Sequence, residues 1–170
     1  STPNLLHEEE PEVSKLMIDR LKREYGVTVS TETVVQSVEA IGLTKKLTLG
    51  RKQKTATISV SEIMLASGST AIIDIGLDNA GVRYSKNQIY TDRYQRTTAP
   101  HIYAAGDCCG PYTYAHTAAY QGQVVAQNIV HPQHPVAAQL HAVPRVFWTN
   151  PEVAAAGLTE RDAKARGTSY

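Results

Sequence analysis

The chain has 170 residues, of which 42% are hydrophobic and 19% are charged, and its formal net charge at pH 7 is +1. This composition is typical of a globular protein with a core, and the near-neutral charge excludes a broad basic surface for nucleic acid. No apolar run reaches the roughly eighteen residues that a membrane-spanning helix needs, and no signal peptide opens the sequence.

The two cysteines, Cys108 and Cys109, are adjacent and cannot cross-link a loop. This favours a reducing, cytoplasmic setting. Because the sequence starts without Met and stops in the middle of a pattern, we expect it to be a piece of a longer protein.

The first 67 residues predict one helix followed by short strands. Apolar residues recur at helical spacing over residues 11–25, where Pro11 suits the first turn and Gly26 suits the position just past the end. β-rich runs with turn-like glycines between them predict strands at residues 27–30, 33–41, 46–49, 55–60 and 63–66. The middle three runs form a meander, and the last is a buried strand that leads into Gly68.

The remaining residues predict a mixed α/β chain. Residues 69–87 indicate a loop with a short helical turn at 77–80, and residues 131–142 carry two prolines and indicate a linker. Apolar spacing predicts helices at 114–130 and 159–166 and strands at 88–91, 101–105 and 144–149. Trp148, on the last of these strands, is expected in the core.

The segment from Thr97 to Asp107 carries the chemistry. Pro100 keeps the preceding residue extended, and the apolar residues behind it fit a central strand that ends at Gly106. Asp107 then projects from the carboxyl end of that strand, which is the edge where open α/β sheets bind ligands. A carboxylate there suits the hydroxyls of a sugar or ribityl chain. For this dipeptide alone, an ordinary turn or cap residue is the alternative interpretation.

A helix start follows at Tyr114, Ala115 and His116. Its exposed N–H groups and positive dipole end favour an electron-rich carbonyl or a developing anion. One short segment therefore offers a carboxylate for hydroxyls and a helix terminus for a ring that takes up negative charge, and a reduced flavin needs both.

The segment TTAPHIYAAGD (97–107) is similar to the second FAD fingerprint of the pyridine nucleotide–disulfide oxidoreductases. AHTAAYQGQVVAQNI (115–129) resembles the helix that follows this fingerprint in the family. LLHEEEPEVSKLMIDRLKREYGV (5–27) resembles the second half of the NAD(P)-binding domain. PRVFWTNPEVA (144–154) and GLTE (157–160) resemble the opening of the dimerisation domain. The resemblance covers nearly the whole chain in the family's order.

The resemblance implies an α/β fold made of parts of two Rossmann-like nucleotide-binding domains and the start of an α+β dimerisation domain. Residues 1–67 match the second half of the NAD(P)-binding domain, residues 68–140 the C-terminal part of the FAD-binding domain, and residues 141–170 the start of the dimerisation domain. The implied cofactors are FAD and NAD(P)H, and the implied partner is a second copy of the full-length enzyme.

The family's roles carry over to matching positions. The resemblance implies that Asp107, after Gly106, binds the flavin ribityl chain, and that the backbone of Thr113, Tyr114, Ala115 and His116 approaches the isoalloxazine ring. Gly68 matches a glycine at which the nicotinamide cofactor passes the backbone. The family usually continues that glycine with Arg, a variable residue and Pro, whereas this chain has Ser69-Thr70-Ala71.

Other features have two interpretations each. Cys108 and Cys109 are either two small residues in the turn after Asp107 or accessible thiols in a flavin site. His116 is either a structural residue or a catalytic base. The loosely spaced histidines of residues 131–141 indicate a linker rather than a metal site. Tyr114 and Tyr120 are packing residues, or one of them gates access of the nicotinamide.

We therefore predict part of a flavoprotein that transfers hydride from NAD(P)H through FAD to a disulfide or another small acceptor. Both Gly-x-Gly-x-x-Gly phosphate loops and the redox-active cysteine pair are absent from the sequence, so the 170 residues alone are expected to have no turnover. Two alternatives remain: a related NADH oxidase or ferredoxin reductase, and a non-catalytic product that acts only in association through exposed strand edges.

Overall fold

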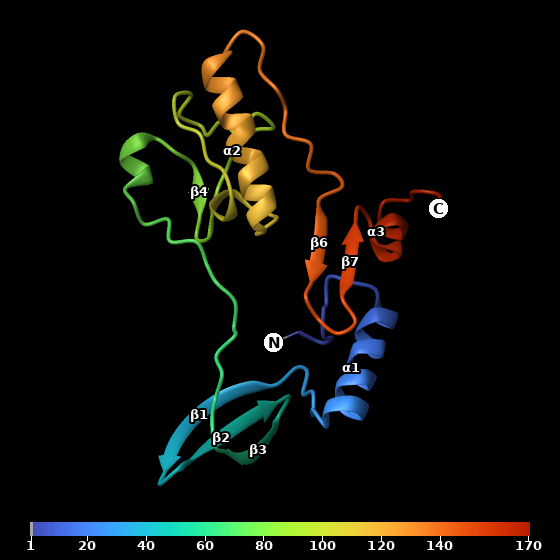
Figure 1. Cartoon of the computed structure of the whole chain (residues 1–170). Coiled ribbons are helices and arrows are strands. Elements are labelled where there is room, and N and C mark those ends of the chain that lie inside the picture. The colour runs from blue at the N-terminus through green and yellow to red at the C-terminus, as the bar shows by residue number, and fades with distance from the viewer. Residues whose placement is uncertain (1) are drawn as a thin grey trace. The chain divides into compact units, whose positions relative to one another are not determined.

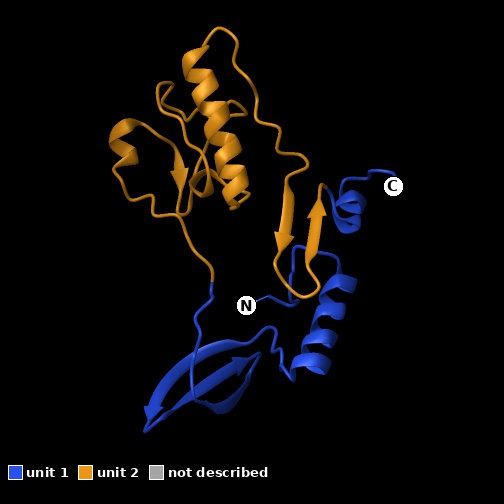
Figure 2. Ribbon diagram, viewed as in Figure 1, with its two compact units in different colours: residues 1–67, 158–170 blue, residues 68–157 orange. Residues whose placement is uncertain are grey.

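The computed structural model describes residues 2–170, which divide into two compact units (Figure 2). Unit 1 combines residues 2–67 with residues 158–170, and unit 2 is residues 68–157. Both units mix short helices with small antiparallel sheets, which confirms the mixed α/β class. All strand pairs formed by the described residues are antiparallel, so the parallel sheets of two Rossmann-like domains stay a prediction.

Helix α1 (Pro11–Tyr25) opens unit 1 and confirms the predicted helix. Pro11 lies in its first turn, where the missing N–H costs nothing. Gly26 ends the helix at φ +64°, and its N–H donates to the carbonyl of Leu21. Met17, at 2% exposure, is the apolar residue that the helix buries. The two ends of α1 are therefore fixed by the residues that local sequence rules favour there.

The strands β1 (Val34–Ile41), β2 (Thr44–Arg51) and β3 (Lys54–Val60) form the predicted meander, in the order β1-β2-β3 (Figure 1). A register shift between Val35 and Ser37 marks a bulge at Gln36. Only Leu47 of this sheet is buried, at 7% exposure. The sheet therefore leaves apolar side chains open on β1, among them Val34, Val38 and Ile41.

The last helix of unit 1, α3 (Glu160–Ala165), begins at a complete capping box. The Thr159 hydroxyl accepts from the N–H of Asp162, and the Asp162 carboxylate accepts from the N–H of Thr159. The side chain and then the backbone N–H of Thr159 hold the pKa of the Asp162 carboxyl below its ordinary value. The Glu10 carboxylate, just before α1, accepts a further bond from the N–H of Glu160. This bond joins two segments of unit 1 that are 150 residues apart in sequence.

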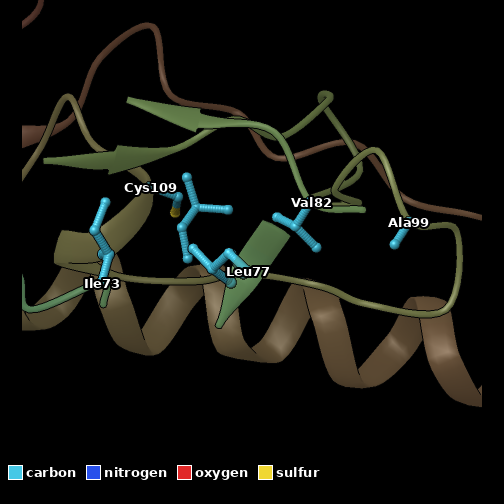
Figure 3. Close-up of a cluster of buried hydrophobic side chains, with 7 residues drawn as sticks. Ile73, Leu77, Val82, Ala99 and Cys109 are labelled. Carbon is cyan, nitrogen blue, oxygen red and sulfur yellow. The ribbon is translucent and has the colours of Figure 1, made fainter. Parts of the chain in front are cut away.

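The core of unit 2 is a small apolar cluster that local turns assemble (Figure 3). It collects side chains from the 3-10 helix η1 (Leu77–Ala80), from the hairpin of β4 (Tyr84–Ser85) and β5 (Gln88–Ile89), and from the 3-10 turn η2 (Asp107–Cys109). Its buried members are Ile73, Leu77, Val82, Ile89, Ala99, Ala104 and Cys109. The predicted helical turn at 77–80 is confirmed, and the predicted strand at 88–91 is confirmed in its first half.

Helix α2 (Ala115–Val130) confirms the predicted second helix and buries Thr117, Gln121, Val124 and Asn128. A coil follows it where a linker was predicted, and then a hairpin of β6 (Pro144–Phe147) and β7 (Val153–Ala156) (Figure 1). The sequence predicted β6 and missed β7.

Three predicted strands are wrong. Residues 27–30 and 63–66 form no strand, and residues 101–105 contribute only an isolated bridge of Tyr103 to Arg96. Met64 and Leu65 are 91% and 87% exposed instead of buried. A strand needs a neighbour to pair its N–H and C=O groups, and no strand within residues 2–170 pairs with these runs. Trp148 is also not in the core, because it follows β6 at 83% exposure.

Candidate functional site

The turn at Gly106-Asp107 is held in a backbone conformation that requires glycine. Gly106 has φ +83° and ψ −155°, a region closed to residues with a side chain. A Cβ at this position would lie 3.1 Å from the Cβ of Ala118 on α2. The turn therefore packs directly against the helix, and Asp107 leaves it in a fixed direction.

A buried glutamine on α2 anchors the same turn. The N–H of Gly106 donates to Oε1 of Gln121 at 2.7 Å, and Gln121 is 2% exposed. The N–H of Cys109 donates to the Gly106 carbonyl at 3.0 Å, and Nε2 of Gln88 donates to the Cys109 carbonyl at 3.1 Å. Each of these backbone groups has its partner, so the turn is fixed from the helix side and from the β5 side.

The carboxylate of Asp107 is exposed on this rigid turn. Within residues 2–170 it takes part in no hydrogen bond or ion pair. A carboxylate that held the turn together would accept bonds from nearby N–H groups, as Asp92 does from Tyr94 and Arg96. The Asp107 side chain therefore caps no backbone group within residues 2–170, its oxygens are open to an external donor, and its role as a ligand of the cofactor stays a prediction.

The start of α2 lies in the same unit. Tyr114 is its N-cap residue, with extended backbone and no hydrogen bond from its side chain to the helix. Thr113, Ala115 and His116 are exposed. The first N–H groups of α2 thus have no side-chain cap and face a position that suits negative charge.

His116 has a structural contact. Its Nε2 lies 2.8 Å from the carbonyl oxygen of Pro144. Its ring stacks on the ring of Tyr114, with the ring centroids 5.5 Å apart and an angle of 8° between the ring planes. Because a carbonyl only accepts, Nε2 carries the hydrogen. The structural interpretation of His116 is the one that the geometry supports.

Cys108 and Cys109 are free thiols in the turn η2. The Sγ of each donates to a backbone carbonyl, Cys108 to Ala105 at 3.3 Å and Cys109 to Gly106 at 3.2 Å. Burial, together with the adjacent Cys108, raises the pKa of the Cys109 thiol to about 11. Cys109 is 3% exposed and packs as a small core residue, and its raised pKa disfavours the thiolate form that a nucleophile needs.

Gly68 is exposed at φ +89°, with open space around the position of a Cβ. Its role stays a prediction.

Gln121 was not identified from the sequence as part of the site, because only the apolar positions of the helix were considered. The signal that could have found it is an uncharged polar residue three positions before Val124, on the face of the helix that is buried.

An FAD molecule fits the chemistry of these groups. Its ribityl hydroxyls are donors for the free Asp107 carboxylate, and its ring carbonyls are acceptors for uncapped N–H groups at the start of α2. The close approach of Gly106 to Ala118 keeps the turn free of a side chain at this point.

No helix within residues 2–170 has the length and apolarity that a bilayer crossing requires.

The family described as pyridine nucleotide-disulphide oxidoreductase matches residues 1–122. A dihydrolipoyl dehydrogenase of Chlamydia muridarum is 36% identical over 92% of the chain and 33% of its own length. A mercuric reductase of Bacillus cereus is 33% identical over 96% of the chain and 26% of its own length. The chain spans about a third or less of the length of these two relatives.

Solved structures agree with this comparison. The crystal structure of LpdA from Mycobacterium tuberculosis is similar with a TM-score of 0.79 and 27% identity, over 93% of this chain and 34% of the other. The flavoprotein disulfide reductase RclA from Escherichia coli shares the fold with a TM-score of 0.79 at 19% identity, over 99% of this chain and 38% of the other.

Proposed function

Because the chain belongs to the pyridine nucleotide-disulphide oxidoreductase family, we propose that it is part of an enzyme that transfers hydride from NAD(P)H through FAD to a disulfide or a related small acceptor. Members of this family use FAD and NAD(P)H. The relatives named dihydrolipoyl dehydrogenase and mercuric reductase support this branch over an NADH oxidase or a ferredoxin reductase.

The observation that carries the proposal is the unpartnered Asp107 carboxylate on a turn that Gly106 and Gln121 hold rigid. In the proposed enzyme, Asp107 accepts hydrogen bonds from the ribityl hydroxyls. A charged acceptor held in place by the fold strengthens these bonds, and its position is fixed before the cofactor binds.

The start of α2 has a different role. The backbone of Thr113, Tyr114, Ala115 and His116 faces the isoalloxazine ring in the proposed enzyme, and FAD supplies the hydride chemistry when it is bound. The helix N-terminus stabilises negative charge on that ring, which favours its reduction. Gly68 leaves room for the nicotinamide cofactor to pass the backbone.

The proposed domains follow the family's order. Residues 1–67 belong to the NAD(P)-binding domain, residues 68–140 to the FAD-binding domain and residues 141–170 to the dimerisation domain of a homodimer. Two unpaired cysteines are consistent with a reducing, cytoplasmic location.

The test is flavin binding by the complete protein and by its Asp107→Asn and Asp107→Ala variants. We expect each variant to weaken FAD affinity about 10- to 100-fold, because a charge-assisted hydrogen bond is lost. Asp74→Asn is the matched control, since Asp74 is also an exposed carboxylate of unit 2. If Asp107→Ala and the control bind FAD with equal affinity, Asp107 does not take part in FAD binding.

The second candidate function is association without catalysis. It is favoured by the open apolar side chains of the meander, such as Val34 at 55% and Ile41 at 50% exposure. The absorbance spectrum and the oligomeric state of the purified complete protein decide between the enzyme and the association function. A colourless complete protein that only oligomerises supports association, whereas a flavin absorbance band supports the enzyme.

A further inference from the structure

The coil between α2 and β6 is tied to the helix along its length. We call residues 131–144, which are this coil and the first residue of β6, the strap. Asn128, 1% exposed, donates to the Val136 carbonyl at 3.0 Å and accepts from the Val136 N–H at 2.6 Å. The Tyr120 hydroxyl accepts from the N–H of Gln139 at 2.9 Å. His116 donates to the carbonyl of Pro144 at 2.8 Å.

These three attachments follow an antiparallel order. Helix positions 128, 120 and 116 meet strap positions 136, 139 and 144, so the strap runs back from the end of α2 to its start. Figure 1 shows the same course of the chain beside α2 and down to β6. The segment predicted as a linker therefore has a fixed path, which ends at the first turn of the helix.

His116 differs from the other two attachments in its place. It is the second residue of α2, and Tyr114, on which its ring stacks, is the N-cap residue. At 1.5 Å of rise per residue, Tyr120 lies about 6 Å and Asn128 about 18 Å further along the helix axis. Of the three attachments, the His116 contact is the one at the first turn of α2, where the N–H groups without a side-chain cap lie.

We propose that His116 is a positioning residue for the flavin: by binding the Pro144 carbonyl it fixes the first turn of α2 to the start of β6. This inference rests on the proposed function, because it assumes that the first turn faces the isoalloxazine ring. It assigns no proton transfer to His116. In this proposal β6, the first strand of the β6–β7 hairpin, supports the backbone of the first turn of α2, which contacts the flavin.

The experiment compares three variants of the complete protein. His116→Phe keeps a ring for Tyr114 and loses the donor, His116→Gln keeps an N–H donor, and Tyr120→Phe removes the next attachment as the matched control. The measurements are the visible spectrum of the bound flavin, the single-turnover rate of its reduction by NAD(P)H, and hydrogen exchange of the amides of residues 115–118 in protein without flavin.

We expect His116→Phe to shift the flavin band, to slow reduction several-fold and to speed amide exchange about threefold, in line with the loss of one solvent-exposed hydrogen bond. His116→Gln should restore all three. Tyr120→Phe keeps the aromatic ring and loses only the hydroxyl that accepts from Gln139, so it should leave the spectrum and the reduction rate unchanged. A His116→Phe protein that matches Tyr120→Phe in the spectrum and the rate overturns the proposal.

Failure of the proposed function gives a different result. If the unsubstituted protein binds no flavin, hydrogen exchange alone decides the inference about the helix start. Faster exchange at residues 115–118 in His116→Phe, but not in Tyr120→Phe, supports the positioning contact. Equal exchange in both variants overturns it.

Discussion

The N–H of Gly106 and Oε1 of Gln121 form a 2.7 Å hydrogen bond between the turn that carries Asp107 and the middle of α2. Gln121 is buried at 2% exposure, and Asn128, two turns further along the same helix, is buried at 1%. A buried amide costs free energy unless it is hydrogen-bonded, so each of them marks a place where the helix holds backbone from another segment.

Replacement of Gln121 by Leu should destabilise unit 2 by about 1–3 kcal/mol, because the N–H of Gly106 loses its acceptor in a buried position. The free energy of unfolding, from hydrogen exchange of the α2 amides, measures this change. Gln123→Leu is the control, since Gln123 is exposed on the same helix. An equal effect of both substitutions would contradict the role of the Gly106 bond.

Two glycines of unit 2 should respond in opposite directions to alanine. Gly106→Ala should cost about 1–3 kcal/mol of stability, because φ +83° disfavours any Cβ and Ala118 lies 3.1 Å away. Gly122→Ala should stabilise by about 0.5–1 kcal/mol, because Gly122 lies inside α2 with open space around it. Thermal unfolding of the two variants shows whether each substitution raises or lowers the stability. A Gly106→Ala protein as stable as the unsubstituted protein would refute the strained turn.

Asn128→Leu should release the far end of the strap. The substitution removes three hydrogen bonds, including one to the Tyr94 carbonyl at 3.1 Å, and we expect a loss of about 2–3 kcal/mol. Limited proteolysis should then cut residues 131–136 faster than in the unsubstituted protein. Gln127→Leu, an exposed neighbour, should leave the cleavage rate as it is.

The buried thiol of Cys109 should make stability depend on alkaline pH. Its pKa is raised by burial from 9.0 to about 11, so the unfolded chain loses this proton first as the pH rises. The contribution is fully present below pH 9 and is lost between about pH 9 and pH 11. Urea unfolding across this range should show a steeper loss for the unsubstituted protein than for Cys109→Ala. Parallel curves would mean that the thiol is not desolvated.

Local rules predicted the elements that depend on local chemistry. Pro11, Gly26 and the apolar spacing between them specify α1, and alternation with short turns specifies the meander. The wrong strands at 27–30, 63–66 and 101–105 are apolar runs whose structure depends on a pairing neighbour, which no local pattern reveals. β7 was missed because three of its four residues are Ala, which is depleted in strands, and the strand forms by pairing with β6.

The candidate site divides in the same way. Gly106 and the start of α2 follow from residue chemistry and spacing, and the structure places both in unit 2. Gln121, Asn128 and the contact between His116 and Pro144 depend on chain paths that meet only in three dimensions. A linker and a strap have the same prolines and the same polar composition, so the sequence alone does not separate them.

The bond between Glu10 and Glu160 also bears on how the chain assembles. Unit 1 is discontinuous, with all of unit 2 between its two segments. During synthesis from the N-terminus, α1 and the meander leave the ribosome well before α3 exists to contact Glu10. Unit 2 has its own core, whereas unit 1 needs residues 158–170 to complete it. Unit 1 therefore cannot be completed until all of unit 2 has been synthesised.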